Sequence, residues 1–429
     1  MKIACIGTGF VGVVTSAVMA KLGHSVAGLD IDENKIKSLR NGKAPFFEPG
    51  LEELLAETQS SRTLTFTSSY EEAIIGAEVV FVMVGTPSLP DGQADIKYVV
   101  SAAASLAPFL EEGAVVVIKS TVPPGTNRKI EETIRNQTNV SFTTASVPEF
   151  LKEGSAVEDT LRPDRIIIGA YDKQTGDILA DLHRPLTENI IRMLPESAQM
   201  AKYASNAYLA QRITFINQIA NLCEKNNADI EEVIKGMGAD HRIGSHYWYP
   251  GLGYGGSCFP KDVREIAAYS KAVGESDSIF IKISELNDAR IPKLMKGYDR
   301  FVGGFSGKKV AVLGLSFKPN TNDIREAPAL KVIPWLLEHG ATVSASDPQA
   351  VDVIRPHLPS SVSFHPDAYS AIIGTSVVML LIEWDEYKSL DMSRVSSLMA
   401  NGKYFIDTRN QYDKASVEAQ GISYKGVGR

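Results

Sequence analysis

The sequence predicts an α/β protein with two doubly wound parallel-sheet domains joined by a long central helix. Strand-like runs alternate with helical segments over residues 1–195, and the same alternation returns over residues 301–429. Residues 196–300 have apolar residues at three- and four-residue spacing and no strand signal. Strands that alternate with helices form parallel sheets covered on both faces, so we expect one such α/β domain at 1–195 and a second at 301–429. Residues 196–300 are expected to form a helical domain between them.

The composition excludes several classes of protein. The chain has 429 residues, 44% hydrophobic and 22% charged, and a formal net charge of -7. This charge leaves no basic excess to neutralise the phosphates of a nucleic acid. No uncharged apolar run reaches the roughly 18 residues that span a bilayer, and glycines interrupt the apolar N-terminal stretch, so no membrane segment or signal peptide is expected. We therefore expect a cytoplasmic protein without nucleic-acid or membrane partners.

The first 30 residues form a βαβ unit. A buried strand (2–7) leads into a helix (10–23), and a second strand (24–30) ends at Asp30. The glycines in the first turn follow the pattern GxGxxG of Rossmann-like domains, in which a pyrophosphate contacts the helix N-terminus. Asp30 is placed to accept hydrogen bonds from an adenosine ribose, which favours NAD over NADP. The predicted cofactor contacts here are Gly7, Gly9, Phe10, Val11, Gly12, Asp30 and Lys35.

The remaining elements follow from the same patterns. Further strands of the first sheet are expected at 77–87, 113–125, 140–150 and 164–170. A long helix and a shorter one are expected between 196 and 238, and helical stretches follow at 263–274 and 278–301. A strand, a helix and a strand ending in Asp347 repeat the opening plan over 307–347, with further strands at 377–387 and 403–410. The polar loop 314–323 replaces the glycine turn, so the two α/β domains are expected to bind different ligands.

Cys258 is the candidate nucleophile among three cysteines. Cys5 lies in the first strand and Cys223 in the long helix, where a thiol is usually a small buried apolar group. Cys258 stands in GYGGSCFPKD (253–262), where we interpret the glycines as clearing its approach. An ammonium such as that of Lys261 lowers the pKa of a nearby thiol, and a thiolate can attack a carbonyl group. No cysteine or histidine has metal-ligand spacing, so no metal is expected.

The ordered motifs resemble the UDP-glucose/GDP-mannose dehydrogenase family over essentially the whole chain. Besides GYGGSCFPKD, they are IGTGFVG (6–12), VGTP (84–87), KSTVPPGT (119–126), VPEFLKEG (147–154), KYASNAY (202–208), GLSFKPNTNDIRE (314–326) and IDTRN (406–410). The segments RIG and GGSCFPKD most resemble the UDP-glucose 6-dehydrogenase branch. The resemblance implies a four-electron oxidation of UDP-glucose to UDP-glucuronate, with two NAD⁺ consumed, and a homodimer.

The resemblance also implies roles for individual residues. Cys258 would form the thiohemiacetal and thioester, and Glu149 would act as the general base toward water. The remaining implied catalytic residues are Lys202 and Asn206, which share a helix face, Asp262 and Thr121. Further cofactor contacts would be Thr86, Thr121, Glu153, Lys261 and Arg325. Substrate contacts would be Glu149, Phe150, Leu151, Lys202, Asn206, Arg242 across a dimer interface, Tyr247, Tyr249, Gly255, Lys318 and Arg409. Tyr249 stands where animal members can have a lysine.

Three alternatives remain open at this stage. The chain can be a GDP-mannose or UDP-N-acetylmannosamine dehydrogenase of the same family, since the base and the sugar are contacted by loops. It can be a nucleotide-sugar sensor with a vestigial cofactor domain, although the cysteine, lysine and glutamate are all present. It can also be a two-electron 2-hydroxyacid or 6-phosphogluconate-type dehydrogenase, which has no need of a nucleophilic cysteine.

Overall fold

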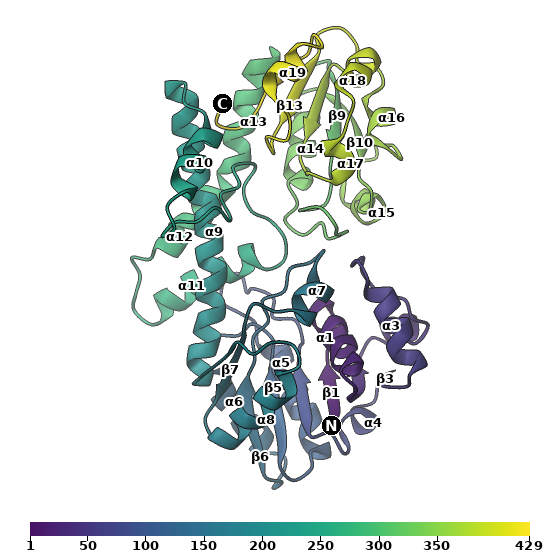
Figure 1. Cartoon of the computed structure of the whole chain (residues 1–429), viewed down its shortest axis with the longest axis vertical. Helices are drawn as coiled ribbons and strands as arrows, with labels where there is room; N and C mark the ends of the chain where they lie inside the picture. Colours follow the sequence, from purple (N-terminus) through teal and green to yellow (C-terminus); the bar gives the residue numbers. More distant parts are fainter. The chain divides into compact units, whose positions relative to one another are not determined.

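The computed structural model describes residues 1–429 and contains two compact units. The first comprises Met1–Ser205 with Ala268–Glu275, and the second comprises Asn206–Ala267 with Ser276–Arg429. The boundary falls within the 32-residue helix α9 (Pro195–Asn226) (Figure 1). At 1.5 Å per residue this helix is about 48 Å long. The predicted α/β fold class is confirmed, including the long central helix.

The first unit is built on one eight-stranded sheet with the order β3-β2-β1-β4-β5-β6-β7-β8. Its strands are β1 (Lys2–Ile6), β2 (Ser25–Leu29), β3 (Leu64–Thr67), β4 (Val79–Val82), β5 (Ala114–Ile118), β6 (Phe142–Ser146), β7 (Ile166–Ala170) and β8 (Ile190–Met193). All pairs are parallel except β6 with β7, which are antiparallel. Between β1 and β4 the strand order reverses, and ligands of open α/β sheets bind beyond the carboxyl ends of such strands.

Helices cover both faces of this sheet. They are α1 (Phe10–Lys21), α2 (Glu33–Arg40), α3 (Leu51–Ser60), α4 (Tyr70–Ile74), α5 (Lys97–Leu106), α6 (Thr126–Arg135), α7 (Ala156–Leu161) and α8 (Lys173–His183). Successive residues of β1 point to opposite faces: Ile3 and Cys5 pack with α1, α3 and α8, whereas Ala4 and Ile6 pack with α4, α5 and α6. The two apolar cores hold the carboxyl ends of the strands in place.

The second unit combines helices with a six-stranded parallel sheet of order β11-β10-β9-β12-β13-β14. The strands are β9 (Lys309–Leu313), β10 (Thr342–Ser346), β11 (Ser363–Phe364), β12 (Val377–Leu380), β13 (Tyr404–Asp407) and β14 (Ser423–Lys425). The helices are α10 (Ile230–Gly238), α11 (Phe259–Ala272, with its last turn in the first unit), α12 (Ile279–Asp288), α13 (Arg290–Val302), α14 (Ala329–Glu338), α15 (Val351–Ile354), α16 (Ala368–Ile372), α17 (Asp385–Lys388), α18 (Met392–Leu398) and α19 (Lys414–Glu418).

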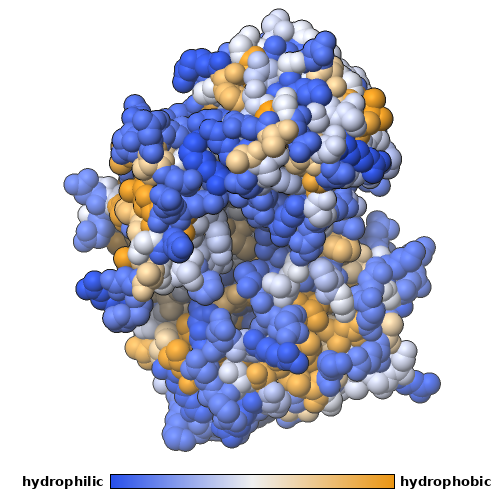
Figure 2. All heavy atoms as spheres, turned by 45° about the horizontal axis from the view of Figure 1, so that its top comes forward, coloured by the Kyte–Doolittle hydropathy of each residue, from blue (hydrophilic) through white to orange (hydrophobic).

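The surface is polar. On the face shown in Figure 2, hydrophilic residues cover most of the visible area, with hydrophobic groups between them. None of the helices combines the length and the apolarity that a bilayer crossing requires.

Candidate active site

The turn between β1 and α1 has the geometry that a dinucleotide requires. Gly7 has a φ of +98°, and a Cβ on Gly12 would lie 1.8 Å from the carbonyl oxygen of Gly7. A Cβ on Gly9 would meet no atom within 4 Å, so the space in front of the α1 N-terminus is open. Phe10 and Val11 form the first turn of α1, whose backbone N–H groups favour an anion. The glycine loop therefore fits the pyrophosphate of NAD.

Asp30 follows β2 and is held in position by the glycine turn. Its carboxylate accepts hydrogen bonds from Thr8 N (2.9 Å), Thr8 Oγ1 (2.8 Å) and Asp32 N (3.0 Å). Partial burial raises the pKa of Asp30, but these hydrogen bonds together with Lys35 lower it overall. Lys35 Nζ lies 3.8 Å from Asp30 Oδ2. The carboxylate is therefore ionised at neutral pH and fits the hydroxyl groups of an adenosine ribose.

Asp347 occupies the corresponding position in the second sheet, after β10, but its oxygens are already engaged. They accept hydrogen bonds from the backbone N–H groups of Leu315, Ser316, Gln349 and Ala350, at 2.7 to 3.1 Å. Asp347 is 5% exposed. This carboxylate organises the loop after β9, and the second sheet does not repeat the ribose site of the first.

The loops after β4 and β5 are joined by the two predicted threonines. Thr86 Oγ1 donates to the carbonyl oxygen of Thr121 at 2.9 Å, and Ser120 Oγ donates to the carbonyl oxygen of Val84 at 2.7 Å. β4 lies at the reversal in strand order and β5 is its neighbour, so the structure brings Thr86 and Thr121 together at this edge.

Glu149 and Lys202 form a buried ion pair within the first unit. Lys202 Nζ lies 2.9 Å from Glu149 Oε1, and their side chains are 4% and 8% exposed. The other carboxylate oxygen accepts a hydrogen bond from Leu151 N at 2.9 Å. The ring of Phe150 lies 5.3 Å from Lys202 Nζ and 3.9 Å from the Arg165 guanidinium. The loop after β6 and the helix α9 thus place four predicted residues in one cluster: Glu149, Phe150, Leu151 and Lys202.

Glu153 lies in the same loop, which is anchored by a residue that the sequence did not single out. Glu48 is 5% exposed, and its two oxygens accept hydrogen bonds from Gly154 N and Ala156 N, both at 2.6 Å. Its hydrogen bond to Ala156 N, the first residue of α7, joins residues 108 apart in the chain. Glu153 itself is 9% exposed.

Cys258 immediately precedes α11, and its side chain is exposed. Its Sγ lies 3.4 Å from Ser257 Oγ, and its carbonyl oxygen accepts a hydrogen bond from Asp262 N at 2.8 Å. A helix N-terminus favours negative charge, which suits a thiolate or an oxyanion formed at this residue.

The glycines before Cys258 have a different role from the one expected. A Cβ on Gly255 would lie 2.4 Å from the carbonyl oxygen of Glu326, and one on Gly256 would lie 2.6 Å from the ring of Phe317. Gly256 N also donates to the carbonyl oxygen of Arg325 at 2.9 Å. The glycines allow the cysteine loop to pack closely against loop 317–326, which contains the predicted residues Lys318 and Arg325.

A buried polar network within the second unit supports the first turn of α11. Asn206 Nδ2 donates to Asp262 Oδ2 at 2.5 Å. Lys261 Nζ lies 2.7 Å from Asp262 Oδ1 and 3.0 Å from Glu265 Oε2. Although burial lowers the pKa of Lys261, the charges of Asp262 and Glu265 raise it above its usual range. The ammonium is therefore held by two carboxylates. Glu265 was not among the predicted site residues, although its i, i+4 spacing from Lys261 could have indicated this ion pair.

Tyr249 and Arg409 line one cavity of the second unit. This cavity has a volume of about 350 Å³ and is also lined by Trp248, Pro250 and Asn410. Arg409 Nε donates to the carbonyl oxygen of Leu381 at 2.8 Å and lies 3.0 Å from Glu383 Oε2. The aromatic rings and the fixed guanidinium form a concave surface suited to a planar base and its ribose.

Other predicted substrate residues lie around this region of the same unit. Tyr247 has a φ of +63°, and its ring lies 6.4 Å from that of Phe259, next to the cysteine. Arg242 is 79% exposed and pairs with Asp240 at 2.6 Å. The guanidinium of Arg242 hydrogen-bonds Asp240, two residues away, and not the cysteine loop.

Arg212 holds the segment that includes these aromatic residues, and the sequence reasoning missed it. Its guanidinium lies 3.9 Å from the ring of Trp248. It also donates to the carbonyl oxygens of Ile243 (3.0 Å) and Gly244 (3.3 Å). Trp248 Nε1 closes the loop by donating to the carbonyl oxygen of Gly244 at 2.8 Å.

The glycine turn, the ionised Asp30 and the cysteine at a helix start define a dinucleotide-dependent dehydrogenase with a candidate nucleophile. The chain belongs to the UDP-glucose/GDP-mannose dehydrogenase family. Residues 1–187 match the model of the family's NAD binding domain, 196–289 its central domain and 311–414 its UDP binding domain. The predicted family, the NAD cofactor and the assignment as an NAD-dependent oxidoreductase are confirmed.

Individual relatives agree with this result. UDP-glucose 6-dehydrogenase YwqF of Bacillus subtilis is 42% identical over 431 residues, covering 100% of this chain and 98% of its own. A UDP-glucose dehydrogenase structure from Pyrobaculum islandicum has a TM-score of 0.92 and 37% identity, covering 99% of this chain and 97% of its own. A UDP-D-ManNAc dehydrogenase from Pyrococcus horikoshii has a TM-score of 0.87 and 27% identity, covering 100% and 99%.

Proposed function

We propose that this chain is an NAD-dependent UDP-glucose 6-dehydrogenase, which oxidises C6 of the glucosyl group to a carboxylate. The observation that supports this function most directly is Cys258 at the start of α11, above a buried Asn206–Asp262–Lys261 network. A two-electron alcohol dehydrogenase has no need of such a cysteine. The relatives named UDP-glucose dehydrogenase are also more similar to this chain than the one acting on UDP-D-ManNAc.

In the first oxidation the C6 alcohol gives up a hydride and releases its hydroxyl proton to water, and an aldehyde remains. NAD⁺, held at the glycine turn and Asp30, would supply the hydride acceptor for both oxidations. Lys202 and Asn206 stand four residues apart on α9, where an ammonium and an amide can donate hydrogen bonds to the C6 oxygen. Their carboxylate partners, Glu149 and Asp262, fix the two side chains in single orientations.

The second oxidation uses the sulfur of Cys258. The thiolate adds to the aldehyde carbon, the resulting thiohemiacetal loses a hydride, and a thioester remains. Water then adds to the thioester carbon, the carbon–sulfur bond breaks, and the products are a carboxylate and the regenerated cysteine. Glu149 takes a proton from this water, and Thr121 helps to orient it. Asp262 orients Asn206 and Lys261 beside the cysteine loop.

The remaining predicted residues are assigned here to the substrate or to the cofactor. Lys318 and Arg242 are proposed to contact the diphosphate, and the cavity of Tyr249 and Arg409 to receive uridine. Phe150, Leu151, Tyr247 and Gly255 are proposed to contact the sugar. Glu153, Lys261 and Arg325 are proposed to contact the cofactor. We further propose that residues 1–195, 196–300 and 301–429 act as cofactor, central and nucleotide-sugar domains.

Replacing Cys258 by Ser tests the proposal. Turnover should be lost while NAD⁺ and UDP-glucose still bind, because the serine hydroxyl is a much weaker nucleophile. Cys223→Ser, which changes a buried thiol (3% exposed), is the control and should keep turnover. Full activity of the Cys258→Ser chain would refute the covalent route. An NADH yield of one per sugar, and not two, would indicate a two-electron enzyme.

The alternative substrates are separated by a direct assay. UDP-glucose, GDP-mannose and UDP-N-acetylmannosamine are each incubated with the enzyme and NAD⁺. Turnover with only a guanine nucleotide, or with only the acetamido sugar, would overturn the assignment. Binding of UDP-glucose without any NADH formation would instead support a sensor.

We propose that the chain forms a homodimer through α9. Tyr208, Phe215 and Leu222 are 56%, 46% and 57% exposed, and their seven-residue spacing places them on one helix face. An exposed apolar stripe of this kind is self-complementary in a twofold dimer. Leu222→Glu should convert the dimer to a monomer in light scattering, with unchanged mass for Leu89→Glu, an exposed leucine elsewhere. The cytoplasmic location stays a prediction, to be checked by cell fractionation.

A further inference from the structure

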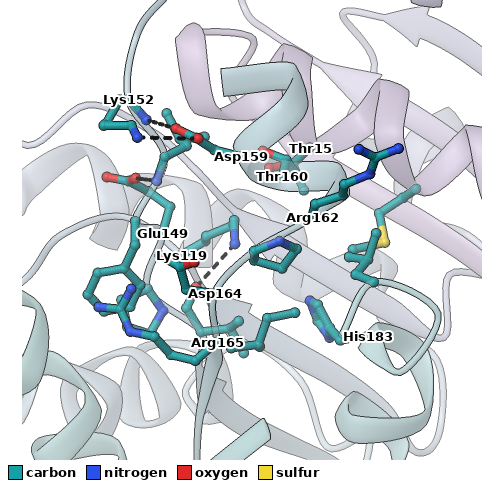
Figure 3. Close-up of a pocket in the computed structure, with 18 residues that line it drawn as sticks. Thr15, Lys119, Glu149, Lys152, Asp159, Thr160, Arg162, Asp164, Arg165 and His183 are labelled. Carbon is teal, nitrogen blue, oxygen red and sulfur yellow. Dashed lines mark hydrogen bonds and ion pairs between the residues drawn. The ribbon is translucent and has the colours of Figure 1, made fainter. Parts of the chain in front are cut away.

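A cavity within the first unit has Glu149 in its wall (Figure 3). Its volume is about 210 Å³, well above the roughly 10–15 Å³ that one water requires. Thr15 and Met19 of α1, Lys119 at the end of β5 and His183 at the end of α8 also line it. These residues come from three elements that the β1–α1 core holds rigidly in place.

Two buried polar atoms of this wall have no hydrogen-bond partner. They are Thr15 Oγ1 and His183 Nε2, on residues that are 1% and 2% exposed. His183 Nδ1 lies 2.7 Å from the carbonyl oxygen of Leu179, so Nδ1 has the hydrogen and Nε2 has a lone pair. Burial, with the charge of Lys119 nearby, lowers the pKa of His183 to about 4, so the ring is neutral. The cavity thus presents a hydrogen-bond acceptor and a hydroxyl group.

Lys119 provides a further hydrogen-bond donor, whose contact with the Val147 carbonyl oxygen is long. Its Nζ lies 3.5 Å from the carbonyl oxygen of Val147, which is at the limit for a hydrogen bond. Burial lowers the pKa of Lys119 to about 8, against the opposing effect of Glu149. A polar group left unsatisfied away from bulk solvent costs about 1–3 kcal/mol, and water removes this cost when the cavity is polar and large enough.

We propose that this cavity is the water site of the thioester step: it holds ordered water between Lys119, His183 and Thr15 and supplies it to Glu149. The inference rests on the proposed function, in which Glu149 is the base for hydrolysis. The water oxygen bonds to the thioester carbon, and Cys258 leaves as the thiolate. One water proton passes to Glu149 and from there to the cavity water; the other leaves when the product carboxyl group ionises. Lys119, His183 and Thr15 act through the water and are positioning residues.

The test separates hydrolysis from hydride transfer. Thr15→Val, His183→Leu and Lys119→Met each remove one group that holds the water. Rapid-quench mass spectrometry measures the covalent adduct on Cys258, and stopped-flow absorbance measures NADH. We expect hydrolysis to slow by about fivefold to tenfold in each variant, the effect of one lost hydrogen bond, so that the adduct accumulates. The first hydride transfer should change by less than about twofold.

Met19→Leu is the matched control, since it alters the same wall, one turn after Thr15, without removing a polar atom. It should hydrolyse the adduct at the parent rate. Because Thr15→Val keeps the shape of its side chain, it tests the inference even if His183→Leu does not fold. A high-resolution crystal structure should show water within hydrogen-bond distance of His183 Nε2; a dry cavity would overturn the inference.

Glu149→Gln serves as the reference for the two proposals. If it keeps the first hydride transfer but accumulates no adduct, the covalent route of the proposed function is wrong and the water site falls with it. If it accumulates adduct while Thr15→Val and Lys119→Met hydrolyse at the parent rate, only the water site is wrong. Equal slowing of hydride transfer and hydrolysis in the cavity variants would also overturn it, because that result indicates a structural role.

Discussion

Replacing Glu149 by Gln should destabilise the first unit, because the Lys202 ammonium then stays buried without its carboxylate. Nζ and Oε1 are 2.9 Å apart, and the two side chains are 4% and 8% exposed. At an effective dielectric constant of about 20, the attraction at this distance is about 6 kcal/mol before the desolvation of both charges is subtracted. Removing one partner of such a pair costs about 3–5 kcal/mol.

The assay is a double-mutant cycle with Glu149→Gln, Lys202→Met and both together. Urea unfolding and hydrogen exchange of peptides from β6 and α9 report the loss in the first unit. The double variant should lose less than the sum of the single losses, by about 2 kcal/mol or more. As a control, Lys173→Met removes the exposed pair with Asp177 and should have no measurable effect. Additive losses, or single losses below about 1 kcal/mol, would refute the argument from burial.

Gly256→Ala, at a φ of +83° and with its Cβ 2.6 Å from the Phe317 ring, should lower the stability of the second unit by about 2 kcal/mol or more in thermal unfolding. Gly236→Ala, in α10 with no atom within 4 Å, should instead be neutral or stabilising. Arg212→Leu should raise KM for the nucleotide sugar, with kcat nearly unchanged, because residues 243–249, which include Trp248, lose the contacts of Arg212. A fall in kcat as large as the rise in KM would contradict this. His183, whose pKa falls from 6.5 to about 4 in the folded chain, should contribute about 3 kcal/mol of stability above pH 6.5 that is lost as the pH falls through 4. His183→Leu should remove this pH dependence from urea-unfolding curves; an unchanged dependence would assign it to other groups.

Most of the fold was predictable because its elements repeat strong local patterns. The first strand was expected at 2–7 and β1 spans Lys2–Ile6; the helix after the glycine turn was expected at 10–23 and α1 spans Phe10–Lys21. The edge strand β8 was missed because it is only four residues long and two of them are exposed. The antiparallel direction of β7 was also missed, since a strand pattern contains no signal for direction.

The candidate site was predictable in its members but only partly in its contacts. The spacing of Lys202 and Asn206 follows from helix geometry, which is local. Their partners, Glu149 and Asp262, are 53 and 56 residues away in the chain, and no local pattern specifies such pairs. The glycines before Cys258 show the same limit. Their small size was evident, but the group they accommodate, loop 317–326, lies about 60 residues downstream and is known only from the folded chain.

The two aspartates at the ends of β2 and β10 show why a repeated pattern does not imply a repeated function. Each follows the second strand of a βαβ unit and binds backbone N–H groups of the turn after the first strand. Asp30 receives two backbone hydrogen bonds, and its side chain is 12% exposed. Asp347 receives four, with Trp384 Nε1 as a further donor at 3.2 Å, and is 5% exposed. A ribose hydroxyl group needs an acceptor with a lone pair it can reach, and only the first carboxylate keeps one. The difference arises from the loop after the first strand: glycines there leave open space, whereas the longer polar loop after β9 folds onto its own aspartate.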